Sequence, residues 1–310
     1  MNIITVTLNP AFDIHCFCES FNPFHENLAK VTSRISGGKG VNISRALTEN
    51  GVENTAFVVL GEENADDFRR NLSDYGMKTL EICVKGRIRE NITVHTNGAP
   101  ETRISFAGFD ADDSLLDKVW DGLKDMLGSD TILTFTGRVP DGISLDAVKK
   151  MLAAMRDKGV KIVIDSKSFG IQDLIDCRPW LIKPNDEEIV DYCDSKVDSI
   201  ESAVLAAQGL RALGIENVMI SLGSKGAVLA CEDGSFAAKA PNVKVLSTIG
   251  AGDSSIGGFV AAKKNGGTYS DMLKTAVCYG SAACMTEGTE PPSKNDVEDL
   301  LTKTCVERIN

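Results

Sequence analysis

The chain has 310 residues, of which 43% are hydrophobic and 25% charged, as is typical of an ordinary soluble globular protein. Its net charge of −11 excludes an extended nucleic-acid or anionic-membrane surface, because both need clustered lysine and arginine. The start lacks the features of a signal peptide, and no apolar run reaches the length of about 18 residues that a membrane span needs. The nine scattered cysteines are expected to be reduced thiols. We therefore expect a cytoplasmic protein in which any phosphate binding is local.

The first 110 residues predict an alternation of strands and helices that gives way to a β-rich stretch. Apolar periodicity predicts, in chain order, a strand at 1–8, a helix at 41–50, a strand at 56–60 and a helix at 65–75. Shorter strands are then expected at 79–84, 92–96 and 101–106, with a hairpin turn at Asn97-Gly98. With the runs 14–17 and 28–35, these strands are interpreted as a small sheet. It would project as a lid formed by segments roughly 14–35 and 79–106.

From Thr131 onward, short β-branched runs are separated by amphipathic helices. Strands are expected at 131–135, 161–164, 180–183, 218–222 and 227–231, with helices at 145–158 and 199–213. A further strand-like run covers 243–246. This pattern predicts an α/β fold with a mainly parallel sheet and helices on both faces. No linker or repeat divides the chain, so we expect one domain over residues 1–310.

The most informative segment is Gly250-Ala251-Gly252-Asp253, which follows the strand-like run and opens an apolar helix. Two glycines with one methyl group between them let backbone N–H groups crowd around an anion, and a helix start adds further free N–H groups. A carboxylate would normally repel that anion. Asp253 is therefore interpreted as a base that takes a proton from a hydroxyl attacking a phosphate. The alternative is a glycine-rich turn with an acid in the first helical turn.

A second glycine-rich segment, Gly37-Gly38-Lys39-Gly40, leaves a strand and opens the helix that carries Asn42. It favours close approach of a polar ligand to the backbone, although a structural turn is equally consistent. It is neither a Walker A loop nor a dinucleotide fingerprint. Asp13 follows the first strand, at the end where ligands bind in parallel sheets, and is a candidate to accept hydrogen bonds from substrate hydroxyls. An Asx turn is its alternative.

Two more segments leave predicted strands. Asn185 and Glu188 are three residues apart, so they share a helix face and could organise water around Mg²⁺; an Asn cap followed by first-turn acids is the alternative. A glycine turn follows the strand at 218–222 and could cover a nucleotide, or form a plain hairpin. The candidate residues of this turn are Ser221, Gly223, Ser224, Lys225 and Gly226.

An anionic substrate also needs positive charge, and this acidic chain offers few candidates. The candidates are Lys30, Arg87, Arg89 and Arg103 near the β-rich stretch, and Arg138 beside Gly137. Most of these charges are expected to be solvated.

Taken together, these segments resemble the PfkB (ribokinase-like) family of carbohydrate kinases. Gly37-Gly38-Lys39-Gly40-x-Asn42 is similar to its N-terminal signature, Gly250-Ala251-Gly252-Asp253 to its C-terminal one, and Asn185-x-x-Glu188 to its NxxE motif. The resemblance extends over nearly the whole chain. It implies a ribokinase-like three-layer α/β/α core with a mainly parallel sheet. It also implies a small β-sheet lid that two subunits of a homodimer share, and ATP and Mg²⁺ as cofactors.

Within this family, the segment from Thr5 to Asp13 is similar to the start of the hexose-phosphate kinases. That branch implies transfer from ATP to a phosphorylated ketohexose. Fructose 1-phosphate, giving fructose 1,6-bisphosphate, is our first choice, and tagatose 6-phosphate or fructose 6-phosphate the alternatives. A function of a different class, a catalytically silent sugar-phosphate-binding regulatory protein, stays open.

The resemblance also assigns roles to individual residues. The catalytic residues would be Asp253 with Gly250, Ala251 and Gly252. The sugar would be bound by Asp13, Gly37, Gly38, Lys39, Asn42 and Gly137, and its phosphate by Arg89, Lys30, Arg138 and Arg103. The nucleotide would be bound by Asn185, Ser221, Gly223, Ser224, Lys225 and Gly226. Glu188 would act on Mg²⁺ through water. Arg138 departs from the branch, which usually has serine there. An arginine fork could bind a phosphate better than a hydroxyl, or could indicate a different substrate.

Overall fold

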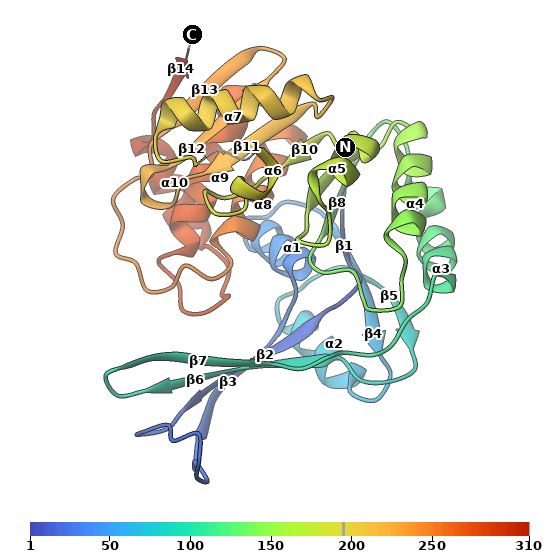
Figure 1. Ribbon diagram of the computed structural model, residues 1–310, viewed down its shortest axis with the longest axis vertical. Helices are drawn as coiled ribbons and strands as arrows, with labels where there is room; N and C mark the ends of the chain where they lie inside the picture. The colour runs from blue at the N-terminus through green and yellow to red at the C-terminus, as the bar shows by residue number, and fades with distance from the viewer. Residues whose placement is uncertain (194–195, 310) are drawn as a thin grey trace.

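The computed structural model describes residues 1–193 and 196–309. Over these residues the chain forms a ten-stranded sheet in the order β14-β13-β12-β11-β10-β9-β8-β1-β4-β5 (Figure 1). The strands from β11 to β5 run parallel, and β12, β13 and β14 extend the sheet antiparallel. The bounds are β1 Asn2–Thr7, β4 Thr55–Gly61, β5 Thr79–Val84, β8 Thr131–Thr136, β9 Lys161–Asp165, β10 Leu181–Ile182, β11 Asn217–Ser221, β12 Ala227–Cys231, β13 Gly234–Ala238 and β14 Val306–Ile309. The prediction of a mainly parallel α/β sheet is confirmed.

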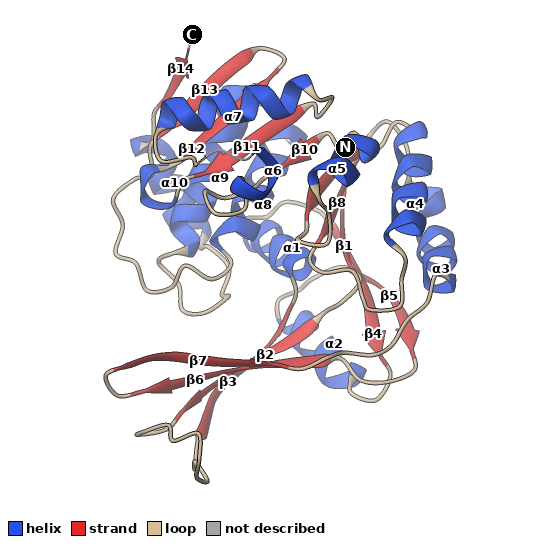
Figure 2. Ribbon diagram, viewed as in Figure 1, coloured by secondary structure: helices blue, strands red, loops and turns tan. Residues whose placement is uncertain are grey.

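Helices cover both faces of this sheet (Figure 2). The bounds are α1 Lys39–Glu49, α2 Ala65–Asp74, α3 Ser114–Leu123, α4 Leu145–Asp157, α5 Ile171–Cys177, α6 Val190–Cys193, α7 Ile200–Ala212, α8 Ala251–Lys264, α9 Tyr269–Ala283 and α10 Lys294–Lys303. Residues from α3, α4, α5 and α7 pack on one face, and residues from α1, α8, α9 and α10 on the other. The three-layer arrangement follows from this division.

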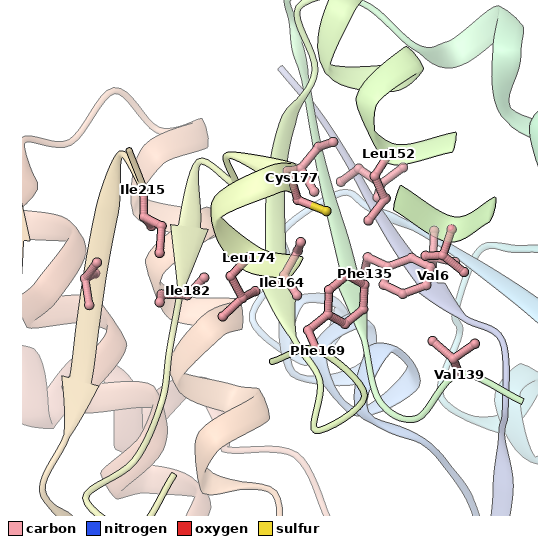
Figure 3. Packing of buried hydrophobic residues seen from close by; sticks show 14 of the residues in the cluster. Val6, Phe135, Val139, Leu152, Ile164, Phe169, Leu174, Cys177, Ile182 and Ile215 are labelled. Carbon is pink, nitrogen blue, oxygen red and sulfur yellow. The ribbon is translucent and has the colours of Figure 1, made fainter. Parts of the chain in front are cut away.

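Strand β1 illustrates why the central strands read as continuous apolar runs. Ile4 and Val6 belong to the core under α4 and α5, whereas Ile3 belongs to the core under α1 and α8. Both faces of the strand are therefore buried, so both sets of alternate side chains must be apolar or small. Figure 3 shows Val6 packed near Phe135 and Leu152 on the first of these faces.

A separate four-stranded sheet, here called the lid, projects from the main sheet at the bottom of Figure 1. Its order is β3-β2-β6-β7, with bounds β2 Ala11–Phe17, β3 Lys30–Gly37, β6 Arg89–Thr96 and β7 Ala99–Ser105. The expected lid segment at 79–84 is wrong, because β5 pairs with β4 at the edge of the main sheet. The lid therefore starts at β2 and resumes only with β6.

Two further differences lie in the C-terminal part. The strand expected at 243–246 is wrong: these residues form a loop in which Val245 and Leu246 are about half exposed. The place beside β13 is taken instead by β14 from the end of the chain. The helices α3, α5, α6, α9 and α10 and the strands β13 and β14 were not predicted. In the described residues no helix is long and apolar enough to cross a membrane.

Candidate active site

The carboxyl ends of neighbouring parallel strands meet at one edge of the main sheet. The polar and glycine residues that follow these ends are Gly137 and Arg138 after β8, Asp165 at the end of β9, Lys183 and Asn185 after β10, and Ser221 at the end of β11. Open α/β sheets bind their ligands at this edge. The starts of α1 and α8 come to the same edge, which brings both glycine-rich segments together.

The start of α8 holds the candidate base. Gly250 adopts a left-handed conformation with φ of 80°, which favours glycine, and no side chain caps the helix in the described part of the chain. The first N–H groups of the helix are therefore available to an anion. Asp253 lies in the first turn with only 8% of its surface exposed, and Asn42 Nδ2 of α1 donates a hydrogen bond to its Oδ2 over 2.9 Å.

A cluster of buried charges surrounds Asp253. Lys39 Nζ lies 2.8 Å from Oδ2 of the buried Asp165, and Lys183 is also buried. Burial alone would raise the pKa of Asp165, but the charges of Lys183 and Lys39 outweigh it and lower that pKa. For Lys39, burial is outweighed by Asp165 and Asp253, which raise its pKa. Both residues are therefore charged at neutral pH.

Asp253 titrates differently from Asp165. Burial is the largest effect and, together with the Asp165 carboxylate, raises the pKa of Asp253 to about 6, against the opposing effects of Lys39, Asn42 and Lys183. A carboxylate with this pKa is mostly ionised at neutral pH, yet it accepts a proton more readily than an exposed aspartate. This suits a general base.

Gly252, between the cradle and the candidate base, leaves room for the side chain of Lys183. A Cβ atom at this position would lie 3.1 Å from Lys183 Nζ. The absence of a side chain therefore lets the lysine reach the helix start, where its charge would also meet an anion.

The sugar-side candidates converge where the lid joins the main sheet. A Cβ atom on Gly37 would lie 2.4 Å from Asp13 Oδ2, so only glycine leaves room for that carboxylate. Asn91 Nδ2 of β6 donates to Asp13 Oδ1 over 2.9 Å. Gly38, with φ of 124°, precedes α1, and Gly137 lies against Lys39. The structure thus brings Asp13, the three glycines and Lys39 together.

Arg89 lies close to both Asp13 and Arg138. Burial lowers the pKa of Arg89, the carboxylate of Asp13 raises it, and the positive charge of Arg138 lowers it again, so both charges act on Arg89. Arg89 Nε is buried without a hydrogen-bond partner among the described residues. Arg138 is 63% exposed and pairs with Asp141 over 2.8 Å. Two adjacent positive charges with an unused donor form a suitable place for a dianion.

Lys30 and Arg103 do not join this cluster within the subunit. Lys30 pairs with Phe17, four residues along β2 from Asp13, or about 13 Å. Arg103 is exposed on β7, opposite Thr93. Their assignment to the sugar phosphate stays a prediction.

The nucleotide-side candidates lie side by side. Asn185 Oδ1 accepts hydrogen bonds from the backbone N–H of Glu188 and Glu187, and Glu188 Oε2 accepts one from the N–H of Asn185. The pair therefore caps a helical turn, as the alternative interpretation expected. Asn185 also forms a β-bridge with Ser221. Glu188 lines a small hollow with Asp165 and Lys183.

The turn after β11 is a hairpin. Gly223–Lys225 form a short 3₁₀ turn, and Lys225 Nζ donates to the carbonyl oxygen of Asp198 over 2.6 Å. A Cβ atom on Gly226 would overlap the carbonyl oxygen of Ala238, so this glycine is needed for the hairpin itself. Ser221, Gly223 and Ser224 remain nucleotide-side candidates by their position next to Asn185.

Asp165, Lys183 and Asn91 are site residues that the sequence interpretation did not include. Asp165 ends one short strand of the parallel sheet and Lys183 follows the next, and such a position is a signal that the sequence contains. Asn91 has no comparable signal, because its position beside Asp13 depends on the pairing of β2 with β6.

Comparison with known proteins agrees with this geometry. The chain matches the family described as "pfkB family carbohydrate kinase" over residues 8–296. The chain belongs to this family. The prediction of family membership from the two glycine-rich signatures is confirmed.

Individual relatives cover most or all of the chain. It is 32% identical over 258 residues, 83% of each chain, to the protein named 1-phosphofructokinase of Escherichia coli strain K12. It is 34% identical over 308 residues, 99% of each chain, to the one of that name in Borreliella burgdorferi. A crystal structure of phosphofructokinase-2 from Escherichia coli in complex with substrates and products matches with a TM-score of 0.91 and 24% identity, covering 98% of this chain and 99% of that one. The last likeness confirms the fold.

Proposed function

We propose that this protein transfers the γ-phosphoryl group of ATP to a hydroxyl of a ketohexose phosphate. The preferred substrate is fructose 1-phosphate, and the product is fructose 1,6-bisphosphate. The observation that carries the proposal is the position of Asp253: a buried carboxylate with a pKa of about 6, held by Asn42 at an uncapped helix start. An anion cradle beside a base is the arrangement that phosphoryl transfer to an alcohol needs.

In the proposed reaction the 6-hydroxyl of the sugar attacks the γ-phosphorus. Asp253 takes the hydroxyl proton, the new O–P bond forms, and the bond from the γ-phosphorus to the bridging oxygen breaks to leave ADP. The N–H groups at the start of α8 and the charge of Lys183 stabilise the negative charge on the transferring group. Asp13 accepts hydrogen bonds from sugar hydroxyls and thereby orients the attacking one.

The sugar phosphate is assigned to Arg89 and Arg138. Arg89 is partly buried, interacts with Asp13, and has a buried Nε that no described residue uses. The relatives named 1-phosphofructokinase support a substrate that already carries one phosphate. We propose that Arg89 makes the main contact, because its fork is more buried than that of Arg138.

Mg²⁺ fits the donors on the nucleotide side. In the described ranges, no three histidine, cysteine or acidic side chains converge on one point. Mg²⁺ commonly keeps several waters and is held partly by substrate phosphates, so a full protein cage is not required. Glu188 would hold it through water beside Asn185, where it would neutralise phosphate charge. ATP itself would extend from the cradle at Gly250–Asp253 toward the turn at Ser221–Gly226.

The lid presents an apolar surface that we assign to a homodimer contact. Its large exposed apolar side chains are Phe17, Phe21, Phe24, Leu28, Val31, Ile104 and Phe106. Phe24 and Leu28 are 88% and 92% exposed, which is unfavourable unless another surface covers them. A second copy of the lid would bury them. We expect the dimer to act in the cytoplasm, where ATP is available.

A coupled ADP-release assay tests this proposal. The panel contains fructose 1-phosphate, fructose 6-phosphate, tagatose 6-phosphate and unphosphorylated fructose. We expect the highest kcat/KM with fructose 1-phosphate. A higher kcat/KM with fructose 6-phosphate or tagatose 6-phosphate would make that sugar phosphate the assigned substrate, within the same branch of the family. Saturable sugar-phosphate binding without any ADP release would instead favour the silent regulatory protein, and a preference for free fructose would overturn the arginine assignment.

A further inference from the structure

Arg45 is a buried arginine that the proposed reaction does not use. It lies in α1, three residues after Asn42, and only 1% of its surface is exposed. Its direct partners are neutral groups, and the carboxylates of Glu290 and Asp13 act on it electrostatically. A buried guanidinium is costly unless its donors are used, so its contacts need a reason.

These contacts join three segments that are far apart in the sequence. One guanidinium nitrogen of Arg45 donates to the carbonyl oxygen of Ser36, and Nη1 donates to that of Thr289 over 3.2 Å. Its guanidinium carbon lies 4.4 Å from the centre of the Tyr75 ring. The Tyr75 hydroxyl in turn contacts both carboxylate oxygens of Glu290 at 2.8 Å.

Two of these segments adjoin opposite sides of the candidate active site. Ser36 immediately precedes Gly37, whose backbone lies against the Asp13 carboxylate on the sugar side. Thr289 lies behind the phosphoryl side, because a Cβ atom on Gly250 would be 3.8 Å from Thr289 Cα. The planar guanidinium of Arg45 therefore contacts a backbone carbonyl group next to each side of the site, that of Ser36 on the sugar side and that of Thr289 on the phosphoryl side. Lysine could not hold both carbonyl groups and the ring together.

Helix α1 thus reaches the start of α8 in two ways. Asn42 holds the Asp253 side chain directly. Arg45, on the same face of α1 three residues later, supports the backbone at Gly250 through Thr289. The first contact orients the base, and the second fixes the cradle relative to the sugar loop.

We propose that Arg45 is a positioning residue that ties the sugar-side segment 36–38 to the phosphoryl-side loop 287–290. When a ligand orders one of these two segments, Arg45 then helps to order the other. Binding of the sugar phosphate strengthens binding of the nucleotide, and the reverse holds by the same factor. The coupling part of this inference rests on the proposed function, whereas the physical tie between the two segments does not.

Hydrogen exchange of the ligand-free protein tests the tie. In Arg45→Met, which keeps an apolar side chain of similar length, we expect faster amide exchange in both 36–38 and 287–290. Arg34→Met is the matched control, because Arg34 also stacks on an aromatic ring, Phe12 at 3.7 Å, from the lid strand β3. It should leave 287–290 unchanged. The inference would be overturned if Arg45→Met left amide exchange unchanged in either segment. It would also be overturned if Arg34→Met raised exchange at 287–290 as much as Arg45→Met does.

Tyr75→Phe keeps the test decisive if Arg45→Met does not fold. It removes only the hydroxyl contact with Glu290 and keeps the ring under Arg45. We expect faster exchange at 287–290 and, transmitted through Arg45, a smaller increase at 36–38. An increase confined to 287–290 would contradict transmission.

Nucleotide binding then tests the coupling. The dissociation constant of a non-hydrolysable ATP analogue is measured with and without fructose 1-phosphate. In the wild type we expect the sugar phosphate to tighten nucleotide binding by about fivefold or more, and in Arg45→Met by less than about twofold. Equal ratios in the two proteins would overturn the coupling. If the wild type bound no sugar phosphate, the proposed function would have failed, and the exchange result would still decide on the tie.

Discussion

Asn42 Nδ2 donates a hydrogen bond to Asp253 Oδ2 over 2.9 Å and so joins the starts of α1 and α8, which are 211 residues apart in the sequence. In the proposed reaction, this contact to Oδ2 leaves Asp253 Oδ1 for the substrate hydroxyl. It also fixes the carboxylate beside Lys39 and Asp165, whose charges act on its pKa. The position of the candidate base is therefore set by one pair of helices, and its electrostatic surroundings by Lys39 of α1 together with the ends of β9 and β10.

The raised pKa of Asp253 predicts the pH dependence of both activity and stability. Turnover should fall as the pH drops through about 6, because the protonated carboxyl cannot act as a base. Since the folded pKa exceeds the usual value of 3.8, this group stabilises the fold below about pH 4, and the contribution is lost as the pH rises through about 6. Asp253→Asn should therefore raise Tm at pH 8 and have less effect near pH 4. A turnover profile flat from pH 5 to 8 would contradict the assignment.

Gly252→Ala tests the close approach of Lys183 to the cradle. The added methyl group would lie 3.1 Å from Lys183 Nζ and push it back by a few tenths of an ångström, so turnover should fall by about three- to tenfold. Gly257→Ala in the same helix is the matched control, since its nearest neighbours would lie at 3.6 Å or beyond. Steady-state kinetics should show the control within about twofold of wild type. Equal losses in both variants would mean that α8 tolerates no alanine at all.

Arg89→Ala tests the sugar-phosphate contact. Loss of a bidentate arginine–phosphate contact in a closed site costs roughly 2–5 kcal/mol, so kcat/KM for fructose 1-phosphate should fall about thirtyfold or more with ATP binding unchanged. Arg138→Ser should cost about tenfold or less, because Arg138 is 63% exposed. Arg87→Ala, an exposed arginine two residues away, serves as the control. A larger loss from Arg138→Ser than from Arg89→Ala would reverse the ranking of the two arginines.

The lid surface predicts the oligomeric state. Phe24→Asp combined with Leu28→Asp places two charges on side chains that are 88% and 92% exposed in the single subunit. We expect light scattering to give a dimer mass for wild type and a monomer mass for this variant, because buried unpaired charges oppose association. Leu205→Asp on α7, which is 69% exposed, should leave the dimer intact. A monomeric wild type would contradict the lid assignment.

The sequence predicted the parts of the site that lie in continuous motifs. Gly37–Asn42 and Gly250–Asp253 each combine a turn, a helix start and a chemically defined side chain within a few residues, so local rules identify them. Asp165 and Lys183 meet Lys39 and Gly252 only because β8, β9 and β10 lie next to one another in that order in the sheet. Strand order is not a local property, and these two residues were missed for that reason.

The errors in the fold have the same origin. The run at 79–84 has the alternation of a lid strand, yet it adds to β4, because β-propensity does not identify a partner strand. The run at 243–246 is equally β-like, but β14 occupies the neighbouring edge of β13. Lys30, which the sequence interpretation groups with Arg89 by its position in the lid, pairs with Phe17 at the far end of β2, and its assignment to the sugar phosphate stays a prediction.

The most direct test of the account is the turnover of Asp253→Asn with fructose 1-phosphate and ATP. The substitution keeps the size of the side chain and removes its basicity, so kcat should fall by roughly 10²–10⁴ while the dissociation constant for the nucleotide stays within about threefold of wild type. Circular dichroism and Tm verify that the variant is folded. A folded Asp253→Asn protein that keeps more than half of the wild-type kcat would show that Asp253 is not the base, and the central claim would be wrong.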